Sequence, residues 1–222
     1  MIRGKTAWYM SAVLGVVLIL LVFGGNVGAQ QEAQVSPISL VSSHDLEFYM
    51  NPLLVDFVRP GLTVQLENPT IGSDRRLRVN VRISDNVGLP LDRNGVFSPG
   101  PVSLSFIAAH LPSENSTYVA YTTRQATSSI TGLTAIQGGT DSGGTYTQLG
   151  DGLYQYSFGT ILPVDYPGSE THAIGVYATR DLRDFELDRQ YSNNVLEFVP
   201  DGSSVTVRRD RVSTEACCTS SE

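Results

Sequence analysis

Cysteine is almost absent from this sequence of 222 residues, which holds two, Cys217 and Cys218, side by side near its end. A network of disulfides across the chain is therefore excluded, and the fold has to depend on its apolar core. Lysine is as scarce, because Lys5 is the only one. The formal net charge of −7 lacks the positive excess that binding to nucleic acid or anionic lipid needs, so no nucleic-acid partner is predicted.

The first 29 residues have the order of a secretory signal peptide. Arg3 and Lys5 precede an apolar run over 7–23, and the small residues of 27–29 precede Gln30. An uncleaved membrane anchor is the alternative, although the run is at the short end for crossing a bilayer. Either interpretation predicts that the rest of the chain is exported.

Three further segments follow the signal segment. Residues 30–61 are predicted to be a leader or linker, in which Pro52 and Pro60 limit any helix to a turn or so. Residues 62–211 are predicted to form a β-sandwich domain, and residues 212–222 a flexible polar tail.

The β prediction depends on alternation with a period of two. In 76–83, Leu77, Val79, Val81 and Ile83 alternate with polar residues, which puts four aliphatic side chains on one face. Segments separated by Gly, Pro and Asp turns repeat the pattern at 62–67, 102–109, 117–123, 145–149, 153–158, 172–179, 194–198 and 204–209. The expected fold class is all-β, an antiparallel immunoglobulin-like β-sandwich.

Aromatic residues gather after the Asp151-Gly152 turn. Tyr154, Tyr156 and Phe158 share one face of a strand, and we interpret them as core and corner residues whose first hydroxyl bonds back to the backbone. A Tyr-x-x-Arg pattern occurs at 121–124 and again at 177–180. Either the arginine lies along an aromatic face in both strands, or the pattern arises by chance from the composition of strands.

No residue is predicted to be catalytic, and the chain is not expected to be an enzyme. His110 and Ser142 lie in contexts that resemble the histidine and nucleophile segments of trypsin-type proteases. The short span between them leaves no room for the fold that separates those motifs. We therefore interpret His110 as a strand-end residue and the sequence DSGG, which contains Ser142, as a flexible turn.

Asp85 and Asp92 are candidate calcium ligands, because Asn86 and Asn94 accompany them in one oxygen-rich loop. The spacing matches no EF-hand, and a solvated hairpin loop is the favoured alternative. His44 and His172 have no partner at metal-ligand spacing and are interpreted as structural histidines.

From Glu47 onward the chain resembles the N-terminal non-haem region of the OmcA/MtrC-type decahaem c-type cytochromes of bacterial outer surfaces. The phrases that carry the resemblance are VDFVRPGL, DNVGLPLDRNG, FSPGPVSLSFIAAHLP, YVAYTTRQATSSITG, TDSGGTYTQLGDGLYQYSFGT, THAIGVYATRDL and FVPDGSSVTVRRD. The resemblance implies an exported β-sandwich that precedes haem-bearing modules. It also implies a location at the outer membrane surface or in the extracellular space, with the periplasm as the other destination. The role of those modules in the family is extracellular electron transfer. The resemblance therefore also implies outer-membrane electron-transfer proteins or extracellular surfaces as partners.

In that family the last phrase leads into the first Cys-x-x-Cys-His, in which two thiols bind the haem vinyl groups and the histidine ligates iron. Here Cys217 and Cys218 are adjacent and no histidine follows, so Cys217 is interpreted as a remnant of a lost motif, and no haem or other cofactor is expected. The expected product is a truncated family member that acts as a structural and docking module. A free-standing adhesion or glycan-binding sandwich and a non-functional fragment are the alternatives.

Overall fold

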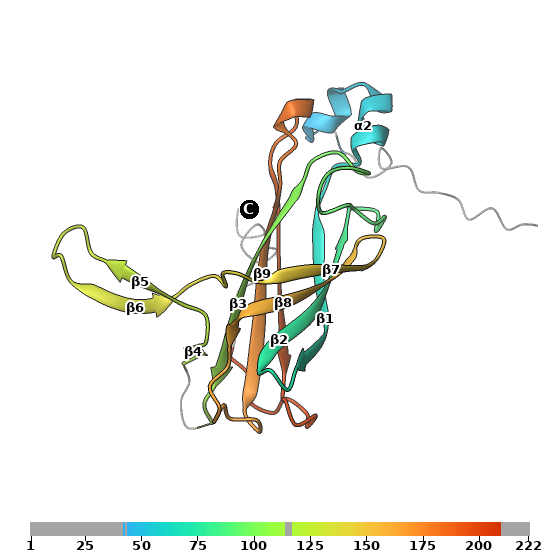
Figure 1. Cartoon of the computed structure of the whole chain (residues 1–222). Coiled ribbons are helices and arrows are strands. Elements are labelled where there is room, and N and C mark those ends of the chain that lie inside the picture. The colour runs from blue at the N-terminus through green and yellow to red at the C-terminus, as the bar shows by residue number, and fades with distance from the viewer. Residues whose placement is uncertain (1–41, 43, 114–116, 210–222) are drawn as a thin grey trace, which may run out of the picture. The chain divides into compact units, whose positions relative to one another are not determined.

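The structure is a computed structural model that describes residue 42, residues 44–113 and residues 117–209, which belong to one compact unit of the chain. Strands dominate it, and they form two four-stranded antiparallel sheets (Figure 1). The predictions for the signal segment and for the tail with Cys217 lie outside the described residues. Among the described residues, no helix is long and apolar enough to cross a membrane.

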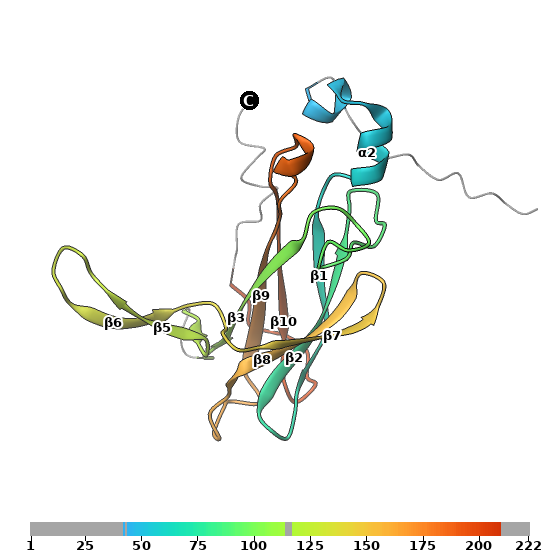
Figure 2. The same ribbon diagram turned by 45° about the horizontal axis from the view of Figure 1, so that its top comes forward.

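The two sheets are sandwich-like, and β7 and β8 run across β3 and β9 in both views (Figure 1 and Figure 2). The first sheet has the order β1 (Thr63–Ile71), β2 (Arg76–Ser84), β8 (Leu153–Ile161) and β7 (Thr145–Gly150). The second has the order β10 (Gln190–Phe198), β9 (Thr171–Arg180), β3 (Val102–Leu111) and β4 (Val119–Ala120). A separate pair consists of β5 (Thr123–Thr127) and β6 (Thr134–Gly138).

The core lies between the two four-stranded sheets. The four aliphatic residues of β2 are almost completely buried, as the alternation predicted. Tyr156 and Phe158 of β8 join them, and the ring of Tyr156 stacks on that of Phe106 from the opposite sheet, with centroids 4.1 Å apart. The interpretation of Tyr154, Tyr156 and Phe158 as buried core residues is confirmed.

Side chains close the seam between β1 and β10, which lie side by side without a backbone ladder. The hydroxyl of Ser192 accepts a hydrogen bond from the Val64 N–H at 3.1 Å, and the amide oxygen of Asn194 accepts one from the Leu66 N–H at 3.3 Å. These bonds satisfy part of the β1 edge, which would otherwise expose unpaired backbone groups.

A short helix packs at one end of the sheets. After the 3₁₀ turn η2 (Leu46–Tyr49), helix α2 spans Pro52–Val58. Asn51 caps its N-terminus by accepting a hydrogen bond from the Leu53 N–H at 3.0 Å, and Pro52 suits the first helical position. Val58 is buried against residues flanking η3 (Arg183–Phe185), so this part of the predicted leader packs on the folded unit.

Two sequence-based strand predictions differ from the structure. Residues 204–209 alternate but form no strand; the contact here is a hydrogen bond from the Thr171 hydroxyl to the Val207 carbonyl at 2.9 Å. Residues 117–123, predicted as one strand, divide between β4 and the start of β5. Strand β6 was not predicted, because neither of its faces packs on a core and its sequence therefore shows no apolar alternation.

Candidate functional site

The core-facing row of β9 begins and ends with a polar side chain. His172 and Arg180 occupy its two ends, with Ile174, Val176 and Ala178 between them, and all five are buried. Buried polar groups are stable only when they are hydrogen-bonded. The partners of these two residues therefore show how the ends of the sandwich are held.

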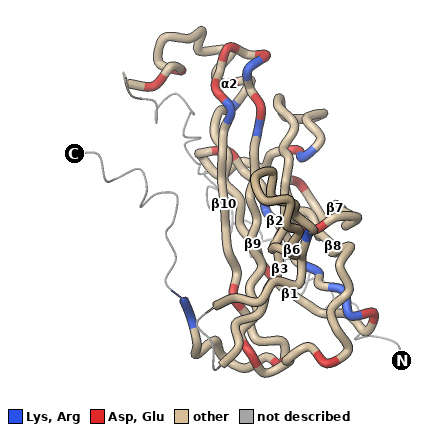
Figure 3. The backbone as a smooth tube through the Cα atoms, turned by 90° about the vertical axis from the view of Figure 1, so that its left-hand side faces the viewer, with Lys and Arg blue, Asp and Glu red and all other residues tan. Residues whose placement is uncertain are grey.

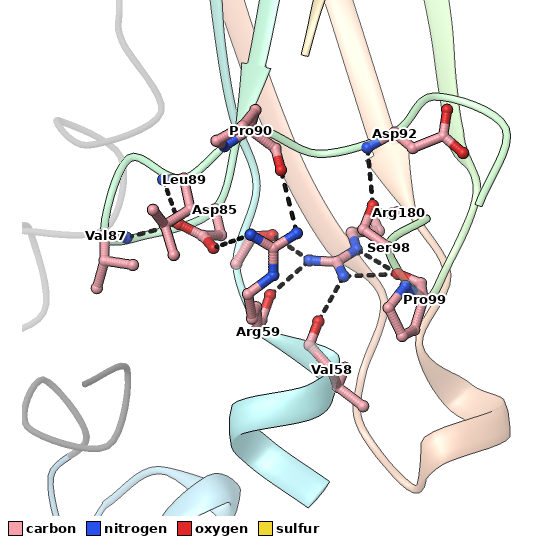
Figure 4. Close-up of polar contacts among 11 residues, drawn as sticks. Val58, Arg59, Asp85, Val87, Leu89, Pro90, Asp92, Ser98, Pro99 and Arg180 are labelled. Atoms are coloured by element: carbon pink, nitrogen blue, oxygen red, sulfur yellow. Dashed lines mark hydrogen bonds and ion pairs between the residues drawn. The ribbon is translucent and has the colours of Figure 1, made fainter. Parts of the chain in front are cut away.

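Arg180 is completely buried and donates hydrogen bonds to four backbone carbonyls (Figure 4). Its Nη1 donates to Arg59 O at 2.7 Å and to Gly61 O at 3.0 Å, and its Nη2 donates to Val58 O at 2.6 Å. Nε and Nη2 both donate to Pro99 O, at 3.0 and 2.6 Å. One guanidinium thus joins the end of α2, the start of β1 and the β2–β3 loop.

The need for this cation follows from the geometry of the α2 C-terminus. The last carbonyls of a helix have no partner within the helix, and Arg59 ends α2 in the left-handed region with φ of 50°. A positive group is favoured where these carbonyls point. Burial, reinforced by nearby Arg59 and opposed by Asp85, lowers the pKa of Arg180 to about 10, so the side chain stays charged at neutral pH.

Asp85, one of the two calcium candidates, is buried beside this cluster. Its Oδ1 accepts hydrogen bonds from the Val87 N–H at 3.0 Å and the Leu89 N–H at 2.9 Å, and its Oδ2 lies 3.6 Å from Nη1 of Arg59 (Figure 4). The carboxylate therefore holds its own loop and forms an ion pair with Arg59.

Asp92, the other candidate, accepts hydrogen bonds from three backbone N–H groups, those of Asn94, Val96 and Phe97. The Tyr154 hydroxyl also donates to it at 3.1 Å, and accepts from the Arg93 N–H at 3.0 Å. The predicted bond from this hydroxyl to the backbone is confirmed, with its partner in the β2–β3 loop. The described residues contain no group of three or more His, Cys, Asp or Glu side chains suited to a metal ion, and the calcium site stays a prediction.

Histidines gather at the opposite end of β9. His172 Nδ1 lies 3.0 Å from Glu170 O, which can only accept, so Nδ1 donates and Nε2 accepts from the Tyr121 hydroxyl at 2.8 Å. Burial lowers the pKa of His172, which fits this neutral form. His110 lies opposite His172 in the ladder, and its Nε2 is 3.8 Å from Glu170 Oε2. The interpretations of His172 as structural and of His110 as a strand-end residue are confirmed.

The first residue of the DSGG segment, Asp141, is held by side-chain and backbone hydrogen bonds, and the chain bends at Gly143. Asp141 accepts hydrogen bonds from Tyr156 and Gly159 at Oδ2, both at 2.8 Å, and from the N–H and hydroxyl of Thr160 at Oδ1. Its own N–H donates to Phe106 O at 2.7 Å. Asp141 thus ties β8 of one sheet to β3 of the other, a role that the sequence did not indicate, and the flexibility of the turn at 142–144 stays a prediction.

Sequence reasoning missed Arg180 and Asp141 as key residues. A signal for Arg180 exists, because the alternation of β9 places it on the face of Ile174, Val176 and Ala178. The suggested Tyr-x-x-Arg device does not apply to it, since its partners are carbonyl groups. No signal exists for Asp141, whose partners in β8 lie 15–19 positions away.

The outer face of the second sheet carries an aromatic pair. Tyr177 and Tyr191 are 52% and 55% exposed, and their ring centroids are 6.4 Å apart. Ser105 and Asn193 flank Tyr177 in the neighbouring strands. The only charged residues of β3, β9 and β10 are Arg180, which is buried, and Glu197, which is half-buried, and these strands are mostly tan in Figure 3. This face therefore offers stacking surface and uncharged hydrogen-bonding groups.

No model of a known protein family and no curated protein matches this chain. The fold resembles part of a decahaem cytochrome. The solved structure of the outer membrane decahaem cytochrome OmcA aligns with a TM-score of 0.50 and 18% identity, over 71% of this chain and 26% of that one. The structure of MtrC from Shewanella baltica OS185 aligns with a TM-score of 0.46 and 18% identity, over 71% and 25%.

The chain thus spans about a quarter of the length of the two solved proteins it resembles. The likeness to OmcA confirms the predicted structural resemblance, and at this identity it concerns the fold alone.

Proposed function

We propose that this chain is an exported, non-catalytic β-sandwich module of an OmcA/MtrC-like extracellular electron-transfer system, with a structural and docking role at the cell surface. The observation that carries the proposal is the shared fold with an outer membrane decahaem cytochrome over 71% of this chain. Its partners would be outer-membrane electron-transfer proteins or extracellular surfaces.

We also assign the sandwich to the immunoglobulin-like type. Constant immunoglobulin domains place strands A, B, E and D in one sheet and C, F and G in the other. Taking β1, β2 and β3 as A, B and C and β7 to β10 as D to G gives that arrangement here. Strands β4, β5 and β6 are then an insertion between C and D.

The chemistry of the polar side chains supports a role without catalysis. Arg180, Asp92, Asp141 and His172 each use their polar atoms to hold backbone or neighbouring strands. A reactive group needs instead an oriented partner and an approach for substrate. We therefore assign these residues to the stability of the module.

The residues present do not fit a c-type haem. Both ring nitrogens of His172 are engaged, by Glu170 and Tyr121, and Cys217 and Cys218 lack the spacing of the two vinyl groups. We propose that the module carries no haem of its own and contributes position and contact to haem-bearing partners.

Protease treatment of intact cells that express the full chain tests the location and the haem assignment together. We expect external protease to remove the chain while a periplasmic control protein survives, and the purified chain to have the mass of polypeptide alone. Protection equal to that of the periplasmic control would contradict surface exposure. A covalently bound porphyrin would contradict the haem-free assignment.

A glycan-binding role is a second candidate, and the exposed Tyr177–Tyr191 pair favours it. Stacking on such rings contributes on the order of 1 kcal/mol. If the pair is a sugar platform, Tyr177→Ala should weaken retention on immobilised cell-surface polysaccharide by about fivefold. Phe97→Ala, at an exposed aromatic in the β2–β3 loop, should not weaken it. Affinity electrophoresis measures this, and equal retention of both variants and wild type would exclude the platform.

A further inference from the structure

The β5–β6 ribbon is attached to neither four-stranded sheet by a backbone ladder (Figure 1). Its two strands pair with each other from Thr123↔Gly138 to Thr127↔Thr134. The Ser128 N–H donates to Leu133 O at 2.9 Å, which closes the connecting turn. Within the part of the chain that the structure describes, the outer edges of β5 and β6 therefore have no strand beside them.

The ribbon is also free of charge. Residues 125–140 contain no Asp, Glu, Lys, Arg or His, and the tube of β6 is uniformly tan in Figure 3. Three apolar side chains stand on it almost fully in solvent: Ile130 is 93% exposed, Leu133 73% and Ile136 78%.

Open strand edges are normally protected by charged residues, proline or a bulge, because they otherwise pair with any strand they meet. Residues 123–138 have no proline, their ladder is regular and their only charge is Arg124 at the base. Exposed apolar side chains on such an edge mark an interaction site.

The distribution of charge indicates which partner the ribbon binds. The chain has a net charge of −7, so two copies repel each other wherever their charged loops approach. The uncharged ribbon is where two copies can meet without that repulsion. It also matches itself, because antiparallel pairing of two β6 strands about a two-fold axis sets Ile136 beside Ile136 of the second copy.

This register brings the ribbon tip to a groove. Thr134 then lies opposite Gly138 of the other copy, and continuing the ladder by one step sets Leu133 opposite Gly139. Gly138 and Gly139 line a groove of about 620 Å³ at the foot of the ribbon, together with Ile107, Tyr118 and Ala120. The groove is mainly apolar, as a leucine side chain requires. Arg124 is the charged residue of its lining, and its aliphatic stem lies against Gly139.

We propose that the chain forms a two-fold symmetric dimer in which β6 pairs with β6 of a second copy, and Leu133 of each copy enters the groove at the foot of the other ribbon. The inference does not depend on the proposed function. Its tests measure the mass of the assembly and the register of the β6–β6 pair, and neither concerns the location of the chain or haem.

Sedimentation of the full chain, as recovered after export, tests the dimer. We expect a dimer mass for the wild type, and Ile136→Lys should raise the dissociation constant by about 100-fold, because it sets two like charges side by side on the axis. Val164→Lys, at an equally exposed loop position, should remain a dimer. A monomeric wild type, or an Ile136→Lys variant that dimerises as tightly as the wild type, would overturn the proposal.

Cross-linking tests the register independently of affinity. With Cys217 and Cys218 replaced by serine, Ile136→Cys should form a disulfide-linked dimer on mild oxidation, because opposed residues of an antiparallel ladder lie within disulfide reach. Val164→Cys should stay unlinked. If Ile136→Cys stays monomeric while wild type sediments as a dimer, the β6–β6 register is wrong.

Discussion

Replacement of Arg180 by alanine is expected to lower the free energy of unfolding by about 4 kcal/mol. The substitution leaves the carbonyls of Val58, Arg59, Gly61 and Pro99 without the donor that now satisfies them, in a site closed to water. It also opens a cavity the size of the largest fully buried side chain of the structure. Urea unfolding followed by circular dichroism measures the loss.

Two control variants separate the hydrogen bonds from the charge. Arg180→Lys keeps the charge but cannot reproduce the planar fork that reaches three segments, so we expect roughly half of the loss. Arg82→Ala removes an exposed arginine that pairs with Glu67 at 3.0 Å, and should cost no more than about 1 kcal/mol. If Arg180→Ala is as mild as Arg82→Ala, the guanidinium does not hold the end of the sandwich.

The sequence predicts the strands of the sandwich well because burial imposes the period of two. In β2 one face meets the core and the other meets solvent. The alternation of apolar and polar residues from Leu77 to Ile83 therefore predicts the strand and its buried face. The same signal fails at 204–209, where alternation occurs without a sheet edge to pair with. A strand is stabilised by its neighbours, and a single-sequence pattern does not contain them.

The residues that hold the two ends of the sandwich were harder to predict, because their hydrogen-bond partners are distant in the sequence. Arg180 reaches the carbonyl of Val58 across 122 positions, and Tyr154 reaches the loop before β3 across 62. Asp85 and Asp92 could be recognised as loop carboxylates. Whether such oxygens face a cation or their own backbone depends on the fold of the loop, which the spacing did not show.

The same reasoning explains why the ribbon escaped prediction. Residues 125–140 combine Thr, Ile, Ala and Gln without a buried face, which resembles a polar loop when read as a single chain. The lack of charge indicates an interaction surface only when it is combined with the two open strand edges that the structure shows. Composition then indicates a surface that another strand covers.

Replacement of Asp141 by asparagine should lower the free energy of unfolding by about 3 kcal/mol at neutral pH, because a charged acceptor of four hydrogen bonds becomes an amide with one acceptor oxygen. An amide nitrogen would then face either Gly159 and Tyr156 or Thr160. The link that Asp141 forms between β8 and β3 would then lose part of its hydrogen bonds.

The pH dependence distinguishes this role from simple packing. Burial alone would raise the pKa of Asp141, but the hydrogen bonds from Thr160, Gly159 and Tyr156 outweigh it and hold the pKa below its usual value. A carboxylate with a depressed pKa stabilises the fold fully above its unfolded pKa and loses that contribution as the pH falls through the folded value. The wild-type and Asp141→Asn stabilities should therefore begin to approach each other as the pH falls below about 4, the unfolded pKa, and should meet below the folded pKa.

Asp165→Asn, at an exposed turn, should differ from wild type by less than about 0.5 kcal/mol at every pH. Urea unfolding at neutral and acidic pH compares the three proteins. A gap between wild type and Asp141→Asn that stays constant down to pH 3 would show that Asp141 acts through shape and not through its charge. Asp141 directly follows the uncharged stretch 125–140. Its hydrogen bonds with β3 and β8 therefore also anchor the base of the β5–β6 ribbon to the sandwich.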